Sequence, residues 1–409
     1  MKKLLLVSAV AASTLMAQGY RIPEQSLNST ALAGAYVSNT SAADAAYYNP
    51  ANMAFMSSNK HLELNAMYIH LNPIDFTGQV TVPDGLGGTT TVLSDAQSAS
   101  EDFIIPQISL VAAPMGEDED VRFGLSVNAP AGLAKRWPEY PQAVSAEEFS
   151  LKVIEINPTI SYRIMDNLAI AGGVRFIYSE GVIKANTAAG SGLMQNAIDM
   201  EGDSWDIGYN LALSYKPFDM WGMAITYRSE VDLTEEGGAK TVLPEYTGDP
   251  TTPATLPGTV SIPLPAVLTI ATDVDVTEST NIEFVYERVF WSAYDELKIE
   301  VPFMNAVIQS DKNWEDANSI RLGLTQGLGD SFDVMLGLAY DQTGTPDETL
   351  GFELPDSDGY IASVGARWAV NDEFDLGAAF LYDAKEERSV TNDTIDGTFS
   401  GSSATIFSV

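Results

Sequence analysis

Strict alternation of apolar and polar side chains recurs along the chain. In SWDIGYNLALSYK, one row of alternate residues, Trp205 to Tyr215, is apolar or aromatic, while the other, Asp206 to Lys216, is small or polar. The same period of two recurs in IEINPTISYRI, FDVMLGLAY and FDLGAAFLY. Because successive side chains of a strand point to opposite faces, this period predicts half-buried β-strands. We expect fourteen, at 61–71, 103–113, 121–130, 151–164, 168–180, 205–216, 220–231, 265–275, 281–291, 318–327, 332–341, 359–370, 373–383 and 399–409.

The connections between these strands favour a transmembrane barrel over a soluble sandwich. Counted from the first strand, odd-numbered connections run about 15 to 33 residues and even-numbered ones about 2 to 7. Long external loops alternating with short periplasmic turns are typical of outer-membrane barrels. Trp205 and Tyr215 end one apolar row; their separation of roughly 33 Å, tilted by ~45°, projects to about 23 Å, close to the ~25 Å apolar band of such barrels. The fold class is therefore expected to be all-β, a 14-stranded antiparallel transmembrane barrel.

The N-terminal sixty residues have a different character. Residues 1–17, MKKLLLVSAVAASTLMA, combine two lysines, an apolar stretch and a small residue, as a secretory signal peptide does; the alternative, a membrane anchor, would need ~20 apolar residues. Residues 18–60 are rich in Ala, Ser, Asn and Gly, which suits a hatch inside a polar lumen.

Within this hatch, Asn49, Pro50 and Ala51 predict a rigid bend, although an ordinary surface turn would use the same residues. Residues 61–409 form the barrel, and its last strand is expected to continue beyond Val409.

Composition narrows the possible functions. The net charge of −35 argues against a nucleic-acid partner, because phosphate binding needs clustered Lys and Arg. With no cysteine, disulfides cannot contribute to stability. The two histidines, His61 and His70, lie on one predicted strand with opposite parity, which is a poor arrangement for a catalytic triad or a metal site. We therefore expect no enzyme activity, no metal and no cofactor.

Several segments, in order and spacing, resemble the FadL-type family of outer-membrane transporters of long-chain fatty acids and other hydrophobic compounds. They include GYRIPEQSLNSTALAGAYVSNTSAADAAYYNPANM, KRWPEY, TYRSEVDL and LPDSD. The resemblance implies a monomer in the outer membrane of a Gram-negative bacterium, in contact with lipid and lipopolysaccharide. It also implies passive passage of a hydrophobic small molecule, with rearrangement of the hatch and lateral exit at a kinked third strand. A general porin for small polar solutes is the alternative.

The resemblance also points to particular residues. The third strand, VRFGLSVNAPAGL, contains Gly124, Asn128 and Pro130; glycine marks bulges and proline cannot donate, so a kink there is expected unless Pro130 simply ends the strand. An external hydrophobic groove is expected at Trp137, Pro138 and Phe149, although loop aromatics also pack on one another.

The charge of the substrate is a further expectation from the resemblance. Glu180 and Glu315 align with positions where the family often carries cations that hold a carboxylate. Two acids there would repel a fatty acid and favour a neutral hydrocarbon, unless other lumen residues hold the head group. The candidates for that role are Arg175, Arg228 and Arg321.

Overall fold

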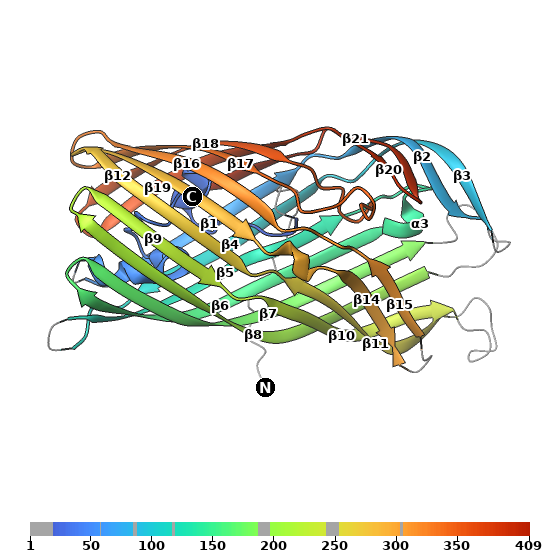
Figure 1. Ribbon diagram of the computed structural model, residues 1–409, viewed down its shortest axis with the longest axis horizontal. Coiled ribbons are helices and arrows are strands. Elements are labelled where there is room, and N and C mark those ends of the chain that lie inside the picture. The colour runs from blue at the N-terminus through green and yellow to red at the C-terminus, as the bar shows by residue number, and fades with distance from the viewer. Residues whose placement is uncertain are drawn as a thin grey trace.

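Fourteen strands close into one antiparallel barrel in the computed structural model, which describes residues 19–57, 59–84, 88–116, 119–186, 197–242, 253–302 and 306–409 (Figure 1). Each wall strand pairs with the next, and β22 pairs back with β1 to complete the ring. The predicted fold class is confirmed, with β1 and β17 matching the expected ranges to the residue. The wall strands are β1 (His61–Leu71), β4 (Glu101–Val111), β5 (Val121–Lys135), β6 (Glu148–Met165), β7 (Leu168–Asn186), β8 (Ala197–Phe218), β9 (Trp221–Arg228), β12 (Val267–Thr277), β13 (Thr280–Val289), β16 (Ala317–Gly327), β17 (Phe332–Asp341), β18 (Gly359–Asn371), β19 (Phe374–Lys385) and β22 (Ser403–Ser408).

The outside of the wall is apolar. In β8, Trp205 and Ile207 are 63% and 68% exposed, whereas Asn210 and Ser214 of the alternate row are buried. Large apolar side chains in continuous exposed rows are unfavourable in water and stable against lipid. The alternation read from the sequence therefore assigns the correct face to each side chain.

The long connections contain regular structure that the sequence did not predict. Eight additional strands lie beyond the wall at the end opposite the short turns (Figure 1). Four of them form a separate cap sheet, in the order β20-β21-β2-β3, and the other four form two hairpins that extend the wall sheet. The cap sheet consists of β2 (Asp75–Pro83), β3 (Thr89–Gln97), β20 (Arg388–Thr391) and β21 (Ile395–Ser400); the hairpins are β10 (Val231–Val242) with β11 (Pro253–Leu264) and β14 (Glu296–Val301) with β15 (Ala306–Asp311).

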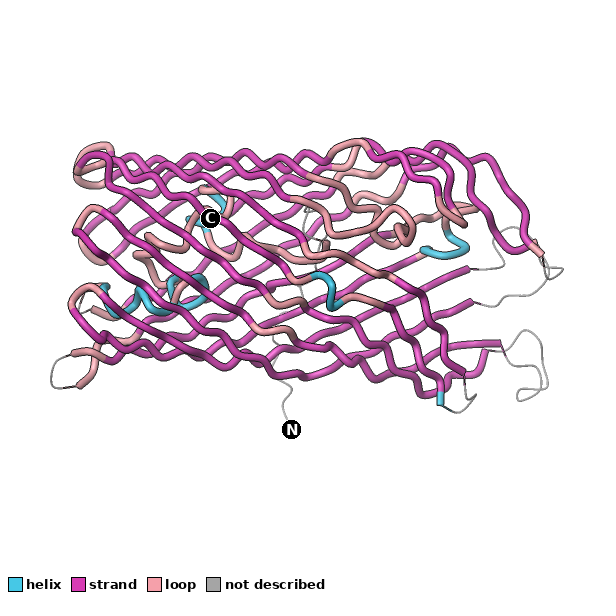
Figure 2. Tube along the Cα trace, in the orientation of Figure 1, coloured by secondary structure: helices cyan, strands magenta, loops and turns pink. Residues whose placement is uncertain are grey.

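Residues 19–56, here called the N-terminal segment, lie inside the barrel. They form the short helices α1 (Leu27–Ala31), α2 (Ala45–Tyr48) and the 3₁₀ helix η1 (Pro50–Phe55), which Figure 2 shows within the ring toward the end with the short turns. Residues 1–17, interpreted as a signal peptide, and Gln18, the first residue of the expected hatch, lie outside the described residues. Of the helices that the structure describes, including α3 (Ala143–Ala146) and η2 (Trp291–Ala293), none is long and apolar enough to cross a membrane.

The Asn-Pro-Ala triplet joins α2 to η1. Asn49 donates from Nδ2 to the carbonyl of Val37 at 2.8 Å and to Ser214 Oγ of the wall, also at 2.8 Å. Its Oδ1 accepts the N–H of Ala51 at 3.2 Å, and Pro50 begins the 3₁₀ helix, where its missing N–H has no cost. The triplet therefore turns the chain and attaches it to β8 at one point.

Wall glycines face the N-terminal segment at close range. A Cβ at Gly337 would lie 2.1 Å from the carbonyl carbon of Leu32, and one at Gly323 would lie 3.0 Å from the Cβ of Ala35. Small inward residues therefore provide the space that the segment occupies, and any larger side chain at Gly337 would overlap its backbone.

We expect Gly337→Leu to dislodge the N-terminal segment while the wall still forms, because the new side chain would meet backbone that cannot rotate away. Overpacking against flexible side chains alone costs about 1–3 kcal/mol. Single-channel conductance in planar bilayers should rise. The control is Gly172→Leu, whose Cβ would meet its nearest neighbours at an ordinary 3.5 Å. Equal conductance in the two variants would contradict the prediction.

Candidate functional site

The wall is interrupted between β4 and β5. These strands pair only where Ile108–Val111 meets Gly124–Val127, although β5 continues to Lys135. Beyond Val127 the register of β5 against β6 shifts between Asn128 and Ala131. The strand therefore bends at Pro130 and does not end there.

Gly124 has a different role from the one expected. It lies in regular pairing with Thr159 of β6 and Val111 of β4, so it is not part of the bend. A Cβ at this position would lie 2.6 Å from Met53 Sδ and 2.9 Å from the Cβ of Ala46. Gly124 therefore allows close approach of the N-terminal segment, and the irregularity begins four residues later.

The first residues of the N-terminal segment cover the interruption. Arg21 forms a bridge with Ala131, the N–H of Ile22 donates to the carbonyl of Pro130 at 2.9 Å, and the N–H of Gly132 donates to the carbonyl of Tyr20 at 2.8 Å. This extended stretch thus replaces β4 as the neighbour of β5. Backbone groups that the bend would otherwise leave unpaired are satisfied here.

Gln25 ends this contact with its side chain. Its Nε2 donates to the carbonyl of Ala129 at 2.8 Å, and its Oε1 accepts the N–H of Ala129 at 2.9 Å. The same Oε1 accepts from Gln107 of β4 at 3.2 Å, and Asn128 donates to the Gln25 carbonyl at 3.0 Å. One buried glutamine therefore contacts both wall strands across the interruption.

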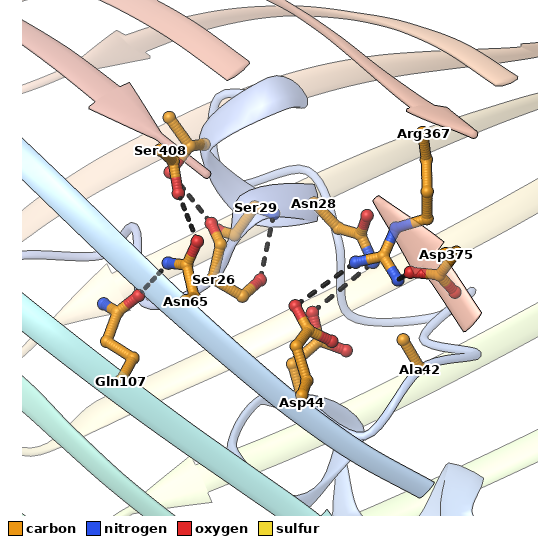
Figure 3. A network of polar contacts seen from close by, with 12 residues as sticks. Ser26, Asn28, Ser29, Ala42, Asp44, Asn65, Gln107, Arg367, Asp375 and Ser408 are labelled. Atoms are coloured by element: carbon orange, nitrogen blue, oxygen red, sulfur yellow. Dashed lines mark hydrogen bonds and ion pairs between the residues drawn. The ribbon is translucent and has the colours of Figure 1, made fainter. Parts of the chain in front are cut away.

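Polar contacts continue from this point around the wall. Figure 3 shows Gln107 beside Asn65 of β1, which in turn accepts a hydrogen bond from Ser408 of β22 at 2.8 Å. In the same view, Asn28 of α1 lies 3.4 Å from Asp44. The N-terminal segment is attached to further wall strands elsewhere, since Ser363 Oγ of β18 donates to the Ala31 carbonyl at 2.8 Å and Arg321 of β16 donates to the Ala33 carbonyl at 2.9 Å.

A small apolar pocket of about 10 Å³ borders the Tyr20 ring. Tyr20 meets the ring of Trp291 edge-on at 4.7 Å, and Trp291 meets Trp314 at 4.8 Å in the same manner. Tyr20 and Trp314 line the pocket, so these aromatic rings form part of its wall. The residues that line the pocket are Tyr20, Leu133, Phe149, Leu151, Ile262, Tyr294, Lys312, Trp314, Thr345, Thr349, Gly351, Glu353 and Leu354.

One ion pair is set into this apolar lining. Lys312 Nζ contacts Glu353 Oε1, and the two side chains are 7% and 20% exposed. Burial acts to raise the pKa of Glu353, but the Lys312 ammonium outweighs it and holds this pKa below its usual value. The pocket therefore presents a single ammonium group that already holds one carboxylate.

Glu180 and Glu315 do not face the apolar pocket. Both side chains are exposed, and neither is among the residues that line the pocket. Glu180 instead contacts Lys152 and accepts from Tyr178 on the outer face of the wall. These two acids therefore give no reason to expect repulsion of a carboxylate at this pocket.

The three residues expected in one external groove are separated. Trp137 is buried under the cap sheet, where its ring meets Phe352 at 5.2 Å and its Nε1 donates to the Phe352 carbonyl at 2.8 Å. Phe149 lines the apolar pocket, and Pro138 is exposed. Trp137 thus fits the alternative that loop aromatics pack on one another, and of the three only Phe149 lines the pocket.

The three arginines expected to hold a head group lie deeper in the lumen and are paired. Arg175 and Arg228 both contact Glu155, and Arg321 contacts Asp341 at 3.0 Å and donates to the Ala33 carbonyl at 2.9 Å. None of them is among the residues that line the apolar pocket. The cation there is Lys312, which the sequence reasoning missed. No pattern in the sequence singles it out, because Trp314 is the one apolar residue in DKNWED.

The two histidines are not brought together. His61 contacts Ser57 Oγ at 3.1 Å near the short-turn end of β1, whereas His70 contacts Asp102 at 2.8 Å near the other end.

Comparisons with known proteins agree over nearly the whole chain. A family model described as outer membrane protein transport protein (OMPP1/FadL/TodX) matches residues 8–408. A long-chain fatty acid transport protein of Escherichia coli O6:H1 is 24% identical over 403 residues, covering 90% of this chain and 87% of that protein. Outer membrane protein P1 of Haemophilus influenzae is 21% identical over 434 residues, covering 94% and 92%.

Solved structures share the fold. A Pseudomonas aeruginosa FadL homologue has a TM-score of 0.82 at 20% identity, with 95% of this chain and 98% of that chain covered. The Pseudomonas putida toluene transporter TodX has a TM-score of 0.68 at 15% identity, with 96% and 98% covered.

We expect Gln25→Ala to loosen the stretch that covers the interruption. The substitution leaves the buried N–H and C=O of Ala129 without their described partner, and each such loss costs about 1–3 kcal/mol. Hydrogen exchange at the amides of Ala129 and Gly132 should become about tenfold faster or more. Gln97→Ala, which removes an exposed hydrogen bond to Asp75, is the control. Unchanged protection at both amides would contradict the prediction.

Proposed function

The chain belongs to the outer membrane protein transport family (OMPP1/FadL/TodX), and from this membership we propose that it carries long-chain carboxylates of the fatty-acid type across the outer membrane. The observation that carries the choice of substrate is the apolar pocket with Lys312 as its cationic residue. The pocket holds only about 10 Å³, so its lining must move apart to admit an alkyl chain, which would then gain roughly 0.8 kcal/mol per buried CH₂. The head group would take the place of Glu353 at the Lys312 ammonium.

Neutral aromatic hydrocarbons are the second candidate substrates. Relatives in fold include toluene transporters, and the rings of Tyr20, Tyr294 and Trp314 offer edges and faces to an aromatic guest. Such a guest would not need Lys312, so the two classes of substrate differ in their dependence on this residue.

The route we propose leaves the barrel sideways. The N-terminal segment lies in the lumen toward the short turns, beside a cavity of about 910 Å³, and, among the described residues, 20–25 pair with β5 across the interruption between β4 and β5. Displacement of this stretch would open the wall without removing the rest of the segment. The segment thus acts as a hatch whose first residues move. A general porin would need the lumen that the segment occupies, so this alternative has less support.

We expect Lys312→Met to weaken palmitate binding by about tenfold to a hundredfold, because a charge-assisted contact contributes about 1.5–3 kcal/mol. Binding of a neutral hydrocarbon of equal length should change by less than about twofold. Equilibrium binding to the purified protein measures both. Lys298→Met is the control, since Lys298 pairs with Glu300 on an exposed hairpin. Equal palmitate affinity in the two variants would exclude Lys312 as the head-group contact.

We expect a disulfide between Arg21→Cys and Ala131→Cys to block uptake. These residues are partners across an antiparallel bridge, a spacing that a disulfide can span, and the chain has no other cysteine. Uptake of labelled palmitate by cells should fall on oxidation and recover on reduction. The control pair is Leu322→Cys with Leu338→Cys, which joins two wall strands that stay paired. Undiminished uptake by the oxidised protein would mean that residues 20–25 need not move.

A further inference from the structure

Two acidic side chains are buried inside the barrel, one in the N-terminal segment and one in the wall. They belong to Glu24 and to Asp383 of β19, and each residue is 0% exposed. Among the residues that the structure describes, no other residue donates a hydrogen bond to the side-chain oxygens of either acid. Burying a carboxylate without donors is unfavourable, and such a group becomes neutral by taking up a proton. Both side chains are therefore candidates to bind protons.

Asp383 lies beside apolar side chains. It is in register with Ile361 of β18 and Ala404 of β22, and both belong to a buried apolar cluster. Ile22 of the N-terminal segment is part of the same cluster. Displacement of residues 20–25 would therefore open this cluster to water, which would solvate a charge on Asp383.

The cations near these acids are already engaged. Lys385 of β19 is buried and pairs with Asp356 at 2.9 Å. Arg321 of β16 contacts Asp341 through both carboxylate oxygens, at 3.0 and 3.2 Å. Glu24 lies 3.6 Å from the same guanidinium. An ionised Glu24 would therefore share one positive charge with Asp341.

The remaining charges around the two acids do not balance them. Glu287 of β13 is paired with Arg21 at 2.9 Å, so this pair adds little net charge. Asp341 repels a negative charge on Glu24 and on Asp383. The two acids also repel each other when both are ionised. A proton on one or both of them removes this repulsion.

Glu24 changes its surroundings if the stretch that covers the interruption moves. Burial raises the pKa of Glu24 to about 7, although the Arg321 guanidinium acts to lower it. A glutamate in water has a pKa of about 4.3. Because Glu24 is one of the residues 20–25, the proposed displacement would carry it from the buried environment into water.

From these contacts we infer that Glu24 and Asp383 form a proton-binding site that holds residues 20–25 against the wall. The inference rests on the movement of these residues in the proposed function and not on the choice of substrate. In the closed state, in which the stretch covers the interruption, both side chains bind protons. When the stretch moves aside, water reaches the two acids and the protons are released.

The direction of the pH effect follows from this linkage. The closed state binds more protons than the open state, so acid favours closing and loss of protons favours opening. For Glu24 the effect lies between about pH 4.3, below which both states are protonated, and about pH 7, above which neither is. Within this range, each released proton raises the ratio of open to closed molecules about tenfold per pH unit.

The site is tested by hydrogen exchange on the purified full-length protein. The amide of Gly132 donates to the Tyr20 carbonyl, so its protection factor, which is corrected for the intrinsic effect of pH on exchange, reports opening. We expect this factor to fall roughly tenfold or more between about pH 5.5 and about pH 8. Glu24→Gln and Asp383→Asn should each reduce the fall, and the double variant should reduce it to less than about threefold.

Two measurements accompany this test. The control is Glu278→Gln, which neutralises an exposed acid at a short turn and should leave the full pH dependence in place. Infrared difference spectra between the two pH values should show loss of protonated carboxyl groups, and this loss should be smaller in the double variant. The heat-dependent electrophoretic mobility of each variant checks that the barrel has formed.

Three outcomes would count against these ideas in different ways. A Gly132 protection factor independent of pH in the unmodified protein would overturn the proton site, and the proposed route would stand if the disulfide between residues 21 and 131 still blocks uptake. Protection that depends on sodium concentration and not on pH would assign the site to a metal cation and also overturn the inference. Undiminished uptake by the oxidised disulfide variant would instead contradict the proposed route itself.

Discussion

Closure of the barrel wall depends on how backbone groups are paired at the point where β5 is no longer hydrogen-bonded to β4. A membrane barrel is stable because every backbone N–H and C=O at the level of the lipid finds a partner in the wall. The bend between Asn128 and Ala131 breaks this rule within the wall itself, and residues 20–25 restore it from inside. The N-terminal segment therefore takes the place of a wall strand here, and elsewhere it lies inside the lumen and is hydrogen-bonded to the wall by side chains.

This double role would let the closed barrel open by the proposed lateral route. Breaking two paired wall strands would cost many hydrogen bonds, whereas moving a short extended stretch costs only the few that hold Tyr20, Ile22 and Gln25. The aromatic cluster around Tyr20 adds an apolar contact that a hydrophobic guest can replace in kind. In the proposed route, the pocket for the substrate and the weakest part of the wall therefore share the same residues.

The sequence predicted the wall well and the site poorly, for a physical reason. A period of two is a local property, so rows such as Trp205 to Tyr215 show both the strand and its outward face. The site is built from contacts distant in the chain: Lys312 meets Glu353, Gln25 meets Ala129, and Trp137 meets Phe352. No local pattern shows these partners, and Gly124 misled because close approach and bending use the same residue type. The cap sheet was missed because its strands lie within segments that read as loops.

The narrow clearance between wall glycines and the N-terminal segment bears on how the molecule is assembled. Leu32 touches the inner surface at Gly337 with less room than a methyl group needs, and Arg321 reaches inward to the carbonyl of Ala33 next to it. A folded helical turn with this little clearance would be hindered in entering a barrel that had already closed. The fit favours an order of assembly in which the wall strands pair around an N-terminal segment that has already folded. The segment would then guide closure of the barrel.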